Sequence, residues 1–89
     1  MIHILQKGMM LLMFTIYRYY DIERIKNLIL TCQGNVYLPM KDGSEIDLKK
    51  NLLILETLFH SGIGKNGLQV RLTDQADVIS FIWIAMQAA

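Results

Sequence analysis

The sequence contains one cysteine, Cys32, and two histidines, His3 and His60, among its 89 residues. A single cysteine excludes an internal disulfide and is typical of a reducing compartment, so we expect a cytoplasmic protein. The three side chains lie far apart in the chain and match no metal-ligand spacing. The sequence therefore predicts neither a bound metal nor another cofactor.

The chain also lacks an excess of charge of either sign and any long apolar run. Nine basic and eight acidic residues are spread along the chain and give a net charge of +1. This balance argues against binding to nucleic acid or to an anionic membrane surface. The apolar run from Met9 to Tyr17 is about half of the ~20 residues that a membrane-spanning helix needs. Because "YRYYDIER" follows this run in place of a small-residue cleavage site, a signal peptide is not predicted either.

A chain of this length forms one domain with one modest core. We expect the domain to occupy residues 9–89. Four of the six methionines lie within the first thirteen residues, so translation can also start at Met9, Met10 or Met13. Residues 1–8, "MIHILQKG", are then an unstructured leader.

The segment from residue 9 to residue 35 predicts a strand followed by a helix. "MMLLMFTIY" is continuously apolar and has no helix signals, which favours a buried strand. Spacings of three and four then predict one apolar helical stripe, made of Ile22, Ile25, Leu28, Ile29 and Cys32. Asp21 is expected to cap this helix, and Gly34 to end it in a left-handed backbone conformation.

Residues 36–48 predict a β-hairpin, because apolar residues alternate on both sides of Asp42-Gly43. The expected two-residue turn has positive φ at both central residues. Pro39 cannot donate a ladder hydrogen bond and marks a bulge or a strand end.

The remaining residues predict a helix, a strand and a final helix. Asp47 is expected to cap a helix from about Leu48 to Phe59, and Gly62 to stop it. "LQVRLT" alternates as a strand, and Thr73 or Asp74 then caps a helix that runs to the end of the chain.

This order of elements predicts an α+β fold, a two-layer open-faced sandwich in which three helices cover one face of a four-stranded antiparallel sheet. The other face of the sheet is expected to be solvated. Its side chains are Tyr37, Glu45, Asp47, Gln69 and Arg71.

The element order and the segment "NVYLPMKDGSEIDLKKNLLILETL" resemble HPr, the histidine-containing phosphocarrier protein of the sugar phosphotransferase system. That family reads as a strand, "DG", a short strand, and then "D-A-K-S" leading into a short helix rich in leucine or methionine. Here Asp42-Gly43 is followed by Ile46 and then by "DLKK", residues 47–50. "LQVRLTDQADVISFI" resembles the last strand, acidic turn and final helix. The resemblance covers about residues 13–87 and implies the fold βαββαβα.

The resemblance also implies where this chain departs from the family's chemistry. The family's phosphoryl-carrying histidine lies in a loop of the form G-L-H-x-R-P-A after the first strand. The matching segment here is "TIYRYYDIERI", and Arg18 or Tyr19 occupies the histidine's position. The family's regulatory serine at the start of the second helix is replaced by Lys50 or Asn51. Both phosphorylation sites are thus missing, and we expect no catalytic activity.

The other motifs are better explained by a structural role than by a chemical one. "GIGKNG", residues 62–67, has the letters G-x-G-x-x-G, but it follows a predicted helix and precedes a strand, the reverse of the dinucleotide-binding context. The tyrosines around Arg18 are expected to cover the sheet edge and the start of the first helix, with a stacking surface as the alternative. Cys32 is expected to be a small core residue.

The second and last helices are apolar over most of their circumference, more than so small a domain can bury. In the last helix we expect a core stripe through Val78, Ile79, Ile82 and Met86. The predicted interface comprises Leu52, Leu55, Phe81, Trp83 and Ile84.

These features favour an HPr-like domain without phosphocarrier activity that acts through protein contacts, with a phosphotransferase-system component or a second copy as the partner. One alternative is an active phosphocarrier that uses a displaced nucleophile such as His60. The other is a structural homo-oligomer unrelated to sugar transport.

Overall fold

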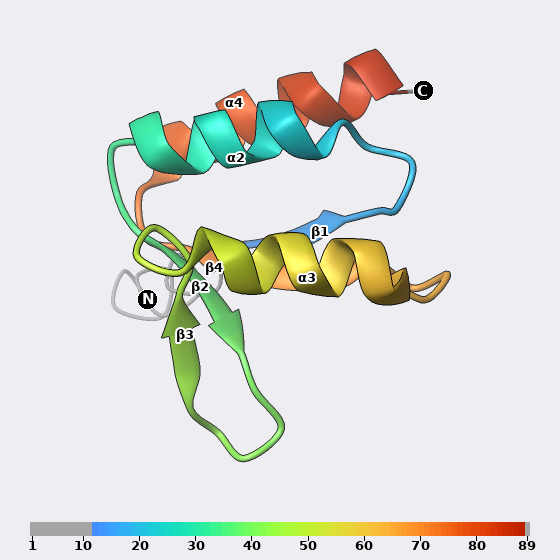
Figure 1. Ribbon diagram of the computed structural model, residues 1–89. Coiled ribbons are helices and arrows are strands. Elements are labelled where there is room, and N and C mark those ends of the chain that lie inside the picture. The colour runs from blue at the N-terminus through green and yellow to red at the C-terminus, as the bar shows by residue number, and fades with distance from the viewer. Residues whose placement is uncertain (1–11, 89) are drawn as a thin grey trace, which may run out of the picture.

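The computed structural model describes residues 12–88 (Figure 1). Its elements are β1 (Leu12–Ile16), α2 (Ile22–Thr31), β2 (Val36–Pro39), β3 (Glu45–Asp47), α3 (Leu52–Gly62), β4 (Leu68–Leu72) and α4 (Gln75–Ala88). The predicted order of strands and helices is confirmed. The predicted leader, His3 and the first residues of the predicted apolar strand lie outside the described residues.

The four strands form one antiparallel sheet in the order β1-β4-β2-β3. In the register of the sheet, Phe14 lies opposite Val70, Val36 opposite Leu72, and Leu38 opposite Ile46. In Figure 1, α2 and α4 lie side by side and α3 crosses in front of the strands, while the β2–β3 hairpin projects away from the helices. The predicted α+β open-faced sandwich is confirmed.

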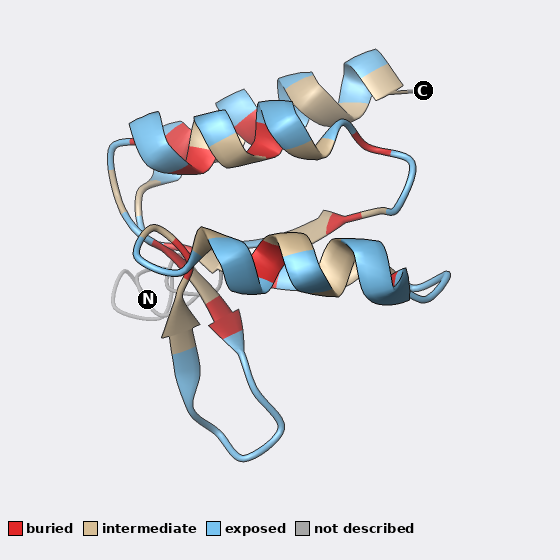
Figure 2. Ribbon diagram, in the orientation of Figure 1, coloured by how far each residue is buried: buried red, intermediate tan, exposed pale blue. Residues whose placement is uncertain are grey.

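The core lies between the sheet and the three helices, and Figure 2 marks the buried residues of the strands and helices in red. Alternate residues of the strands point into it because side chains alternate across a strand. The strands contribute Ile16, Val36, Leu38, Val70 and Leu72. The helices contribute Ile25, Ile29, Leu55 and Phe81.

The opposite face of the sheet carries polar side chains, as predicted. The Arg71 guanidinium donates two hydrogen bonds of 2.7 Å to the Glu45 carboxylate, and its Cζ lies 4.9 Å from the centre of the Tyr37 ring. These three residues belong to β4, β3 and β2, so the contacts join three neighbouring strands.

Helix α2 follows its predicted pattern, with Ile25, Ile29 and Cys32 buried on one stripe. The prediction for Gly34 is wrong, because it lacks a positive φ. Instead it permits close packing, since a Cβ there would lie 2.4 Å from the Oγ1 atom of Thr73. Glycine is needed at this position for space and not for a left-handed turn.

The predicted hairpin is present, but its turn differs from the expected type. Gly43 has φ +91°, and no described residue other than glycine has a positive φ. The N–H of Gly43 donates to the Met40 carbonyl, and the N–H of Met40 donates to the Ser44 carbonyl. The connection is therefore longer than two residues and places only the glycine in a left-handed conformation. Pro39 ends β2, as expected.

Helix α3 begins at Leu52, four residues later than expected. Asp47 is the last residue of β3, and its carboxylate accepts a hydrogen bond from the N–H of Lys49 in the turn that follows. Leu48 is fully buried in that turn and belongs to the core. Gly62 ends the helix with φ +110°, as predicted.

Helix α4 buries a different side from the one predicted. Phe81 is fully buried, whereas Ile79, Ile82 and Met86, three residues of the expected core stripe, are exposed. The Asp74 carboxylate accepts a hydrogen bond from the N–H of Ala76 and caps the helix, one of the two predicted alternatives. Within residues 12–88, no helix has the length and apolar character needed to cross a membrane.

Candidate functional site

The loop between β1 and α2 holds Arg18 and Tyr19, the residues that the resemblance to HPr aligns with the phosphoryl-carrying histidine. The N–H of Tyr20 donates to the carbonyl oxygen of Tyr17 at 3.0 Å, which closes a turn around these two residues. Both side chains are exposed. A protonated guanidinium is not a nucleophile, so Arg18 cannot accept a phosphoryl group as an imidazole does.

Three tyrosines pack against one another in this turn, and Tyr20 joins them to the core. The rings of Tyr17 and Tyr19 stack with centroids 5.5 Å apart, and the Tyr20 ring meets each of them edge-on. Tyr20 is buried and packs against Phe14, and this burial raises the pKa of its hydroxyl. Tyr20 therefore belongs to the core, while Tyr17 is half-buried and Tyr19 is largely exposed and stacked on it.

The N-terminus of α2 is already occupied by a negative charge. The Asp21 carboxylate accepts hydrogen bonds from the N–H groups of Glu23 at 3.0 Å and of Arg24 at 3.3 Å. These N–H groups are the ones that an anion at a helix N-terminus would use. A phosphoryl group bound there would have to displace Asp21 or lie against its carboxylate.

A hollow of about 270 Å³ lies between this helix start and the end of α4. Its lining residues are Tyr19, Asp21, Arg24, Ile84, Gln87 and Ala88. The Arg24 guanidinium donates to the Oε1 atom of Gln87, which ties α2 to α4. The lining thus offers a cation and an anion but no histidine, cysteine or serine that could act as a nucleophile.

Lys50 and Asn51, which the resemblance to HPr aligns with the regulatory serine, lie just before α3. Lys50 is exposed, and Asn51 precedes the helix, where its Nδ2 atom donates to the Asp47 carbonyl at 2.9 Å. Asn51 makes no side-chain hydrogen bond to the first turn of α3. Neither residue carries the hydroxyl that phosphorylation needs.

The neighbouring Lys49 has a structural role. Its Nζ atom donates to the carbonyl oxygen of Cys32 at 2.9 Å and so joins the end of α2 to the turn before α3. A cation near a helix C-terminus is electrostatically favourable. Cys32 itself is a buried free thiol whose pKa is raised by burial, so it is a core residue, as predicted, and a poor nucleophile.

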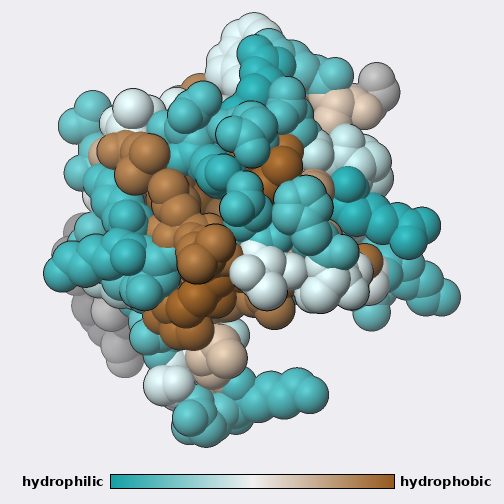
Figure 3. All heavy atoms as spheres, in the orientation of Figure 1, coloured by the Kyte–Doolittle hydropathy of each residue, from teal (hydrophilic) through white to brown (hydrophobic). Residues whose placement is uncertain are grey.

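The predicted interface residues of α3 are less exposed than expected. Leu55 is fully buried and belongs to the core, so its assignment to an interface was wrong, while Leu52 is half-buried. Figure 3 instead shows apolar side chains in a band from the C-terminal end of α2 across the start of α3. The exposed apolar residues of these two helices are Leu30, Leu53 and Ile54.

The predicted interface residues of α4 are also partly buried. Phe81, a predicted interface residue, is fully buried, and Ile84 is half-buried against the core. Trp83 is exposed, as expected. Its exposed neighbours on the helix are Ile79, Ile82 and Met86, which the sequence interpretation had placed in the core.

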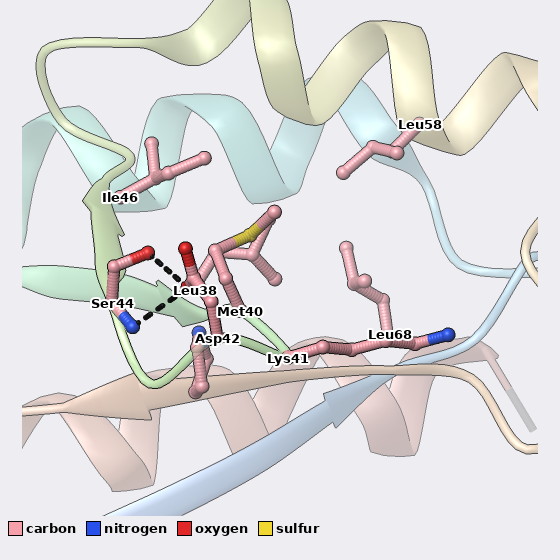
Figure 4. A pocket seen from close by; sticks show the side chains of 9 residues that line it. Leu38, Met40, Lys41, Asp42, Ser44, Ile46, Leu58 and Leu68 are labelled. Carbon is pink, nitrogen blue, oxygen red and sulfur yellow. Dashed lines mark hydrogen bonds between the residues drawn. The ribbon is translucent and has the colours of Figure 1, made fainter.

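An apolar cleft of about 590 Å³ lies under the hairpin. Figure 4 shows Leu38, Met40 and Ile46 of the hairpin on one side and Leu58 of α3 and Leu68 of β4 on the other. The rest of the lining is Pro39, Lys41, Asp42 and Ser44. The Asp42 carboxylate accepts hydrogen bonds from the backbone N–H and hydroxyl of Ser44. The cleft has the size of a ligand site but few polar groups directed into it.

The remaining motifs have structural roles. "GIGKNG" connects α3 to β4, as predicted, and Gly67 approaches β1 so closely that a Cβ would lie 3.0 Å from the Ile16 carbonyl oxygen. His60 is exposed in the last turn of α3. No group of three or more potential metal ligands occurs among residues 12–88.

Comparisons of the chain with models of protein families, with curated proteins and with solved structures found no match.

Proposed function

We propose that this chain is a cytoplasmic HPr-like domain that has lost phosphoryl-carrier activity and acts by binding a protein component of the sugar phosphotransferase system. The loss of carrier activity is supported by the N-terminus of α2, where a carboxylate of this chain already occupies the anion-binding position. There the Asp21 carboxylate accepts the hydrogen bonds from Glu23 and Arg24 that a phosphoryl group would need. The turn before it presents Arg18 and Tyr19 in place of an imidazole.

His60 is a poor substitute nucleophile. It lies in the last turn of α3, where the negative end of the helix dipole disfavours an added anion. His60 also lies one turn after Glu56 on the same side of α3, and a hydrogen bond from Lys26 holds the pKa of the Glu56 carboxyl below its ordinary value. A phosphoryl group on His60 would therefore add negative charge beside an ionised carboxylate.

The exposed apolar side chains support the proposed binding to a protein partner. HPr proteins dock through their first and second helices, which correspond here to α2 and α3. These helices expose Leu30, Leu53 and Ile54, with Leu53 72% exposed. Exposed apolar residues gathered on one face are characteristic of docking surfaces, and the apolar cleft beside α3 can receive a side chain of the partner.

The loss of carrier activity is tested by mass spectrometry after incubation with phosphoenolpyruvate and the first enzyme of the phosphotransferase system. We expect the mass of this chain to remain unchanged while an HPr protein in the same tube gains one phosphoryl group. A gain of one phosphoryl group that His60→Ala abolishes would overturn the proposal and establish the alternative.

Docking is tested by titrating the same purified enzyme with this chain in a calorimeter. We expect binding that Leu53→Glu weakens at least tenfold, because the charge would have to be desolvated in the interface. Trp83→Glu, on α4, is the matched control and should bind as the unmodified chain does. Absence of binding, or equal binding by Leu53→Glu, would contradict docking through α2 and α3.

A further inference from the structure

The outward side of α4 carries a continuous apolar stripe. Ile79 is 63% exposed, Ile82 46%, Trp83 58% and Met86 63%. Their spacing of three, one and three residues places them on one face of the helix. The buried residues Asp77 and Phe81 occupy the opposite side. Helix α4 therefore has two apolar sides, and the domain buries only one of them.

The stripe is large enough to form an interface. Four partly exposed side chains of this size present roughly 500 Å² of apolar surface. Two such surfaces together bury roughly 1,000 Å², the lower limit for a specific protein interface. This area corresponds to a weak, reversible association and not to an obligate one.

The positions within the stripe are symmetric. Its midpoint falls between Ile82 and Trp83, with Ile79 and Met86 equally far on either side. A two-fold axis through this midpoint would place Ile79 against Met86 of a second copy, and Ile82 against the second copy's Trp83. A two-fold dimer requires such a self-complementary patch.

The lack of exposed charge on α4 favours a second copy of this chain as the partner that covers the stripe. The only ionisable residue of the helix is Asp77, which is buried and accepts hydrogen bonds from the N–H groups of Gln33 and Gly34. Two copies therefore bring no like charges of this helix together. A helix that lies on an anionic membrane typically carries Lys or Arg on its polar side, and α4 has neither.

We infer that the outward stripe of α4 pairs with the same stripe of a second copy, with the two helices antiparallel across a two-fold axis. This inference extends the proposed function by naming a further partner at a different surface. Docking through α2 and α3 can fail without affecting it.

Cysteine cross-linking tests the direction of the helices. In a Cys32→Ser background, Ile79→Cys and Met86→Cys chains are oxidised separately and as a mixture. We expect the mixture to give a disulfide-linked dimer and each chain alone to give none. In the antiparallel pair, two residues 79 are about 10 Å apart along the axis and lie on helices ~8–10 Å apart, beyond the ~7 Å that a disulfide spans between Cα atoms. Dimers from each chain alone, or none from the mixture, would overturn the antiparallel pairing.

Sedimentation velocity tests the surface itself. We expect a monomer–dimer equilibrium in the micromolar range and at least a tenfold weaker association for Trp83→Glu. Leu53→Glu is the matched control, since it places the same charge at an exposed apolar position on α3, and it should dimerise normally. A monomer at about 200 µM, or an undiminished dimer of Trp83→Glu, would overturn the inference. If Trp83→Glu loses its helical circular dichroism, Met86→Lys takes its place in the same comparison.

Discussion

The Asp77 carboxylate accepts a hydrogen bond of 2.9 Å from the backbone N–H of Gly34, which joins the first turn of α4 to the segment that follows α2. Its other oxygen accepts from the N–H of Gln33 at 2.8 Å. Asp77 is only 3% exposed, so these bonds satisfy a carboxylate that water does not reach. They also fix the rotation of α4, because Phe81, one turn later, then points into the core.

We expect Asp77→Ala to lower the free energy of unfolding by about 2–4 kcal/mol, because it leaves two N–H groups without their acceptor. Urea denaturation followed by circular dichroism measures the change. Asp74→Ala, which removes one capping bond from the same helix, is the control and should cost about 1 kcal/mol. Equal losses for the two variants would show that Asp77 does not position α4.

Alanine variants of Gly67 and Gly43 separate two effects on stability, steric contact and backbone strain. Gly67 has φ +77°, and a Cβ there would lie 2.5 Å from the Cγ2 atom of Thr15 in β1. Gly43 has φ +91° with nothing within 4 Å of its Cβ position. Both alanine variants suffer the strain of a left-handed backbone, roughly 1–2 kcal/mol, but only Gly67→Ala also displaces a strand.

We therefore expect Gly67→Ala to lower the midpoint of thermal unfolding clearly more than Gly43→Ala does. Differential scanning calorimetry of the two variants at one concentration makes the comparison. Thr15→Ser should restore part of the loss in Gly67→Ala, because it removes the methyl group that the new Cβ meets. Equal midpoints for the two alanine variants would contradict the close approach at β1.

The ion pair between Glu45 and Arg71 predicts that the stability of the fold depends on pH. Hydrogen bonds from Arg71 hold the pKa of Glu45 below its ordinary value. A carboxyl whose pKa is lower in the folded than in the unfolded chain stabilises the fold above the unfolded pKa of about 4.3, and this contribution is lost as the pH falls through the folded value. Glu45→Gln should therefore be less stable than the unmodified chain at pH 7.

The stability difference between Glu45→Gln and the unmodified chain should disappear by about pH 3. Urea denaturation at a series of pH values measures it. The same comparison in an Arg71→Met background is the control and should show no pH-dependent difference, because the partner of Glu45 is gone. A difference that stays constant down to low pH would rule out the proposed titration of Glu45.

The sequence predicted those elements whose pattern has a single interpretation. In α2 one apolar stripe faces one polar side, so Ile25 and Ile29 could be assigned to the core before any tertiary contact was known. The strands alternate cleanly, so Val70 and Leu72 were placed inward and Arg71 outward. These patterns are local, because each depends only on the geometry of its own element.

The candidate site was predictable only where a side chain acts within its own segment. Asp21 caps α2 through N–H groups two and three residues ahead, so the sequence indicated it. The link between Arg24 and Gln87 joins residues 63 positions apart and had no local signal. The start of α3 was also missed, because Leu48 is drawn into the core before the helix begins.

The tertiary structure alone decided which side of α4 faces the core. Apolar residues surround this helix, so its periodicity selects no side, and the predicted stripe through Ile79, Ile82 and Met86 pointed outward. The deciding group was Asp77, the one ionisable residue of the helix, which a sequence pattern would assign to the surface. It is buried because two N–H groups beyond the end of α2 offer it hydrogen bonds, and those groups reach it only once the chain has folded.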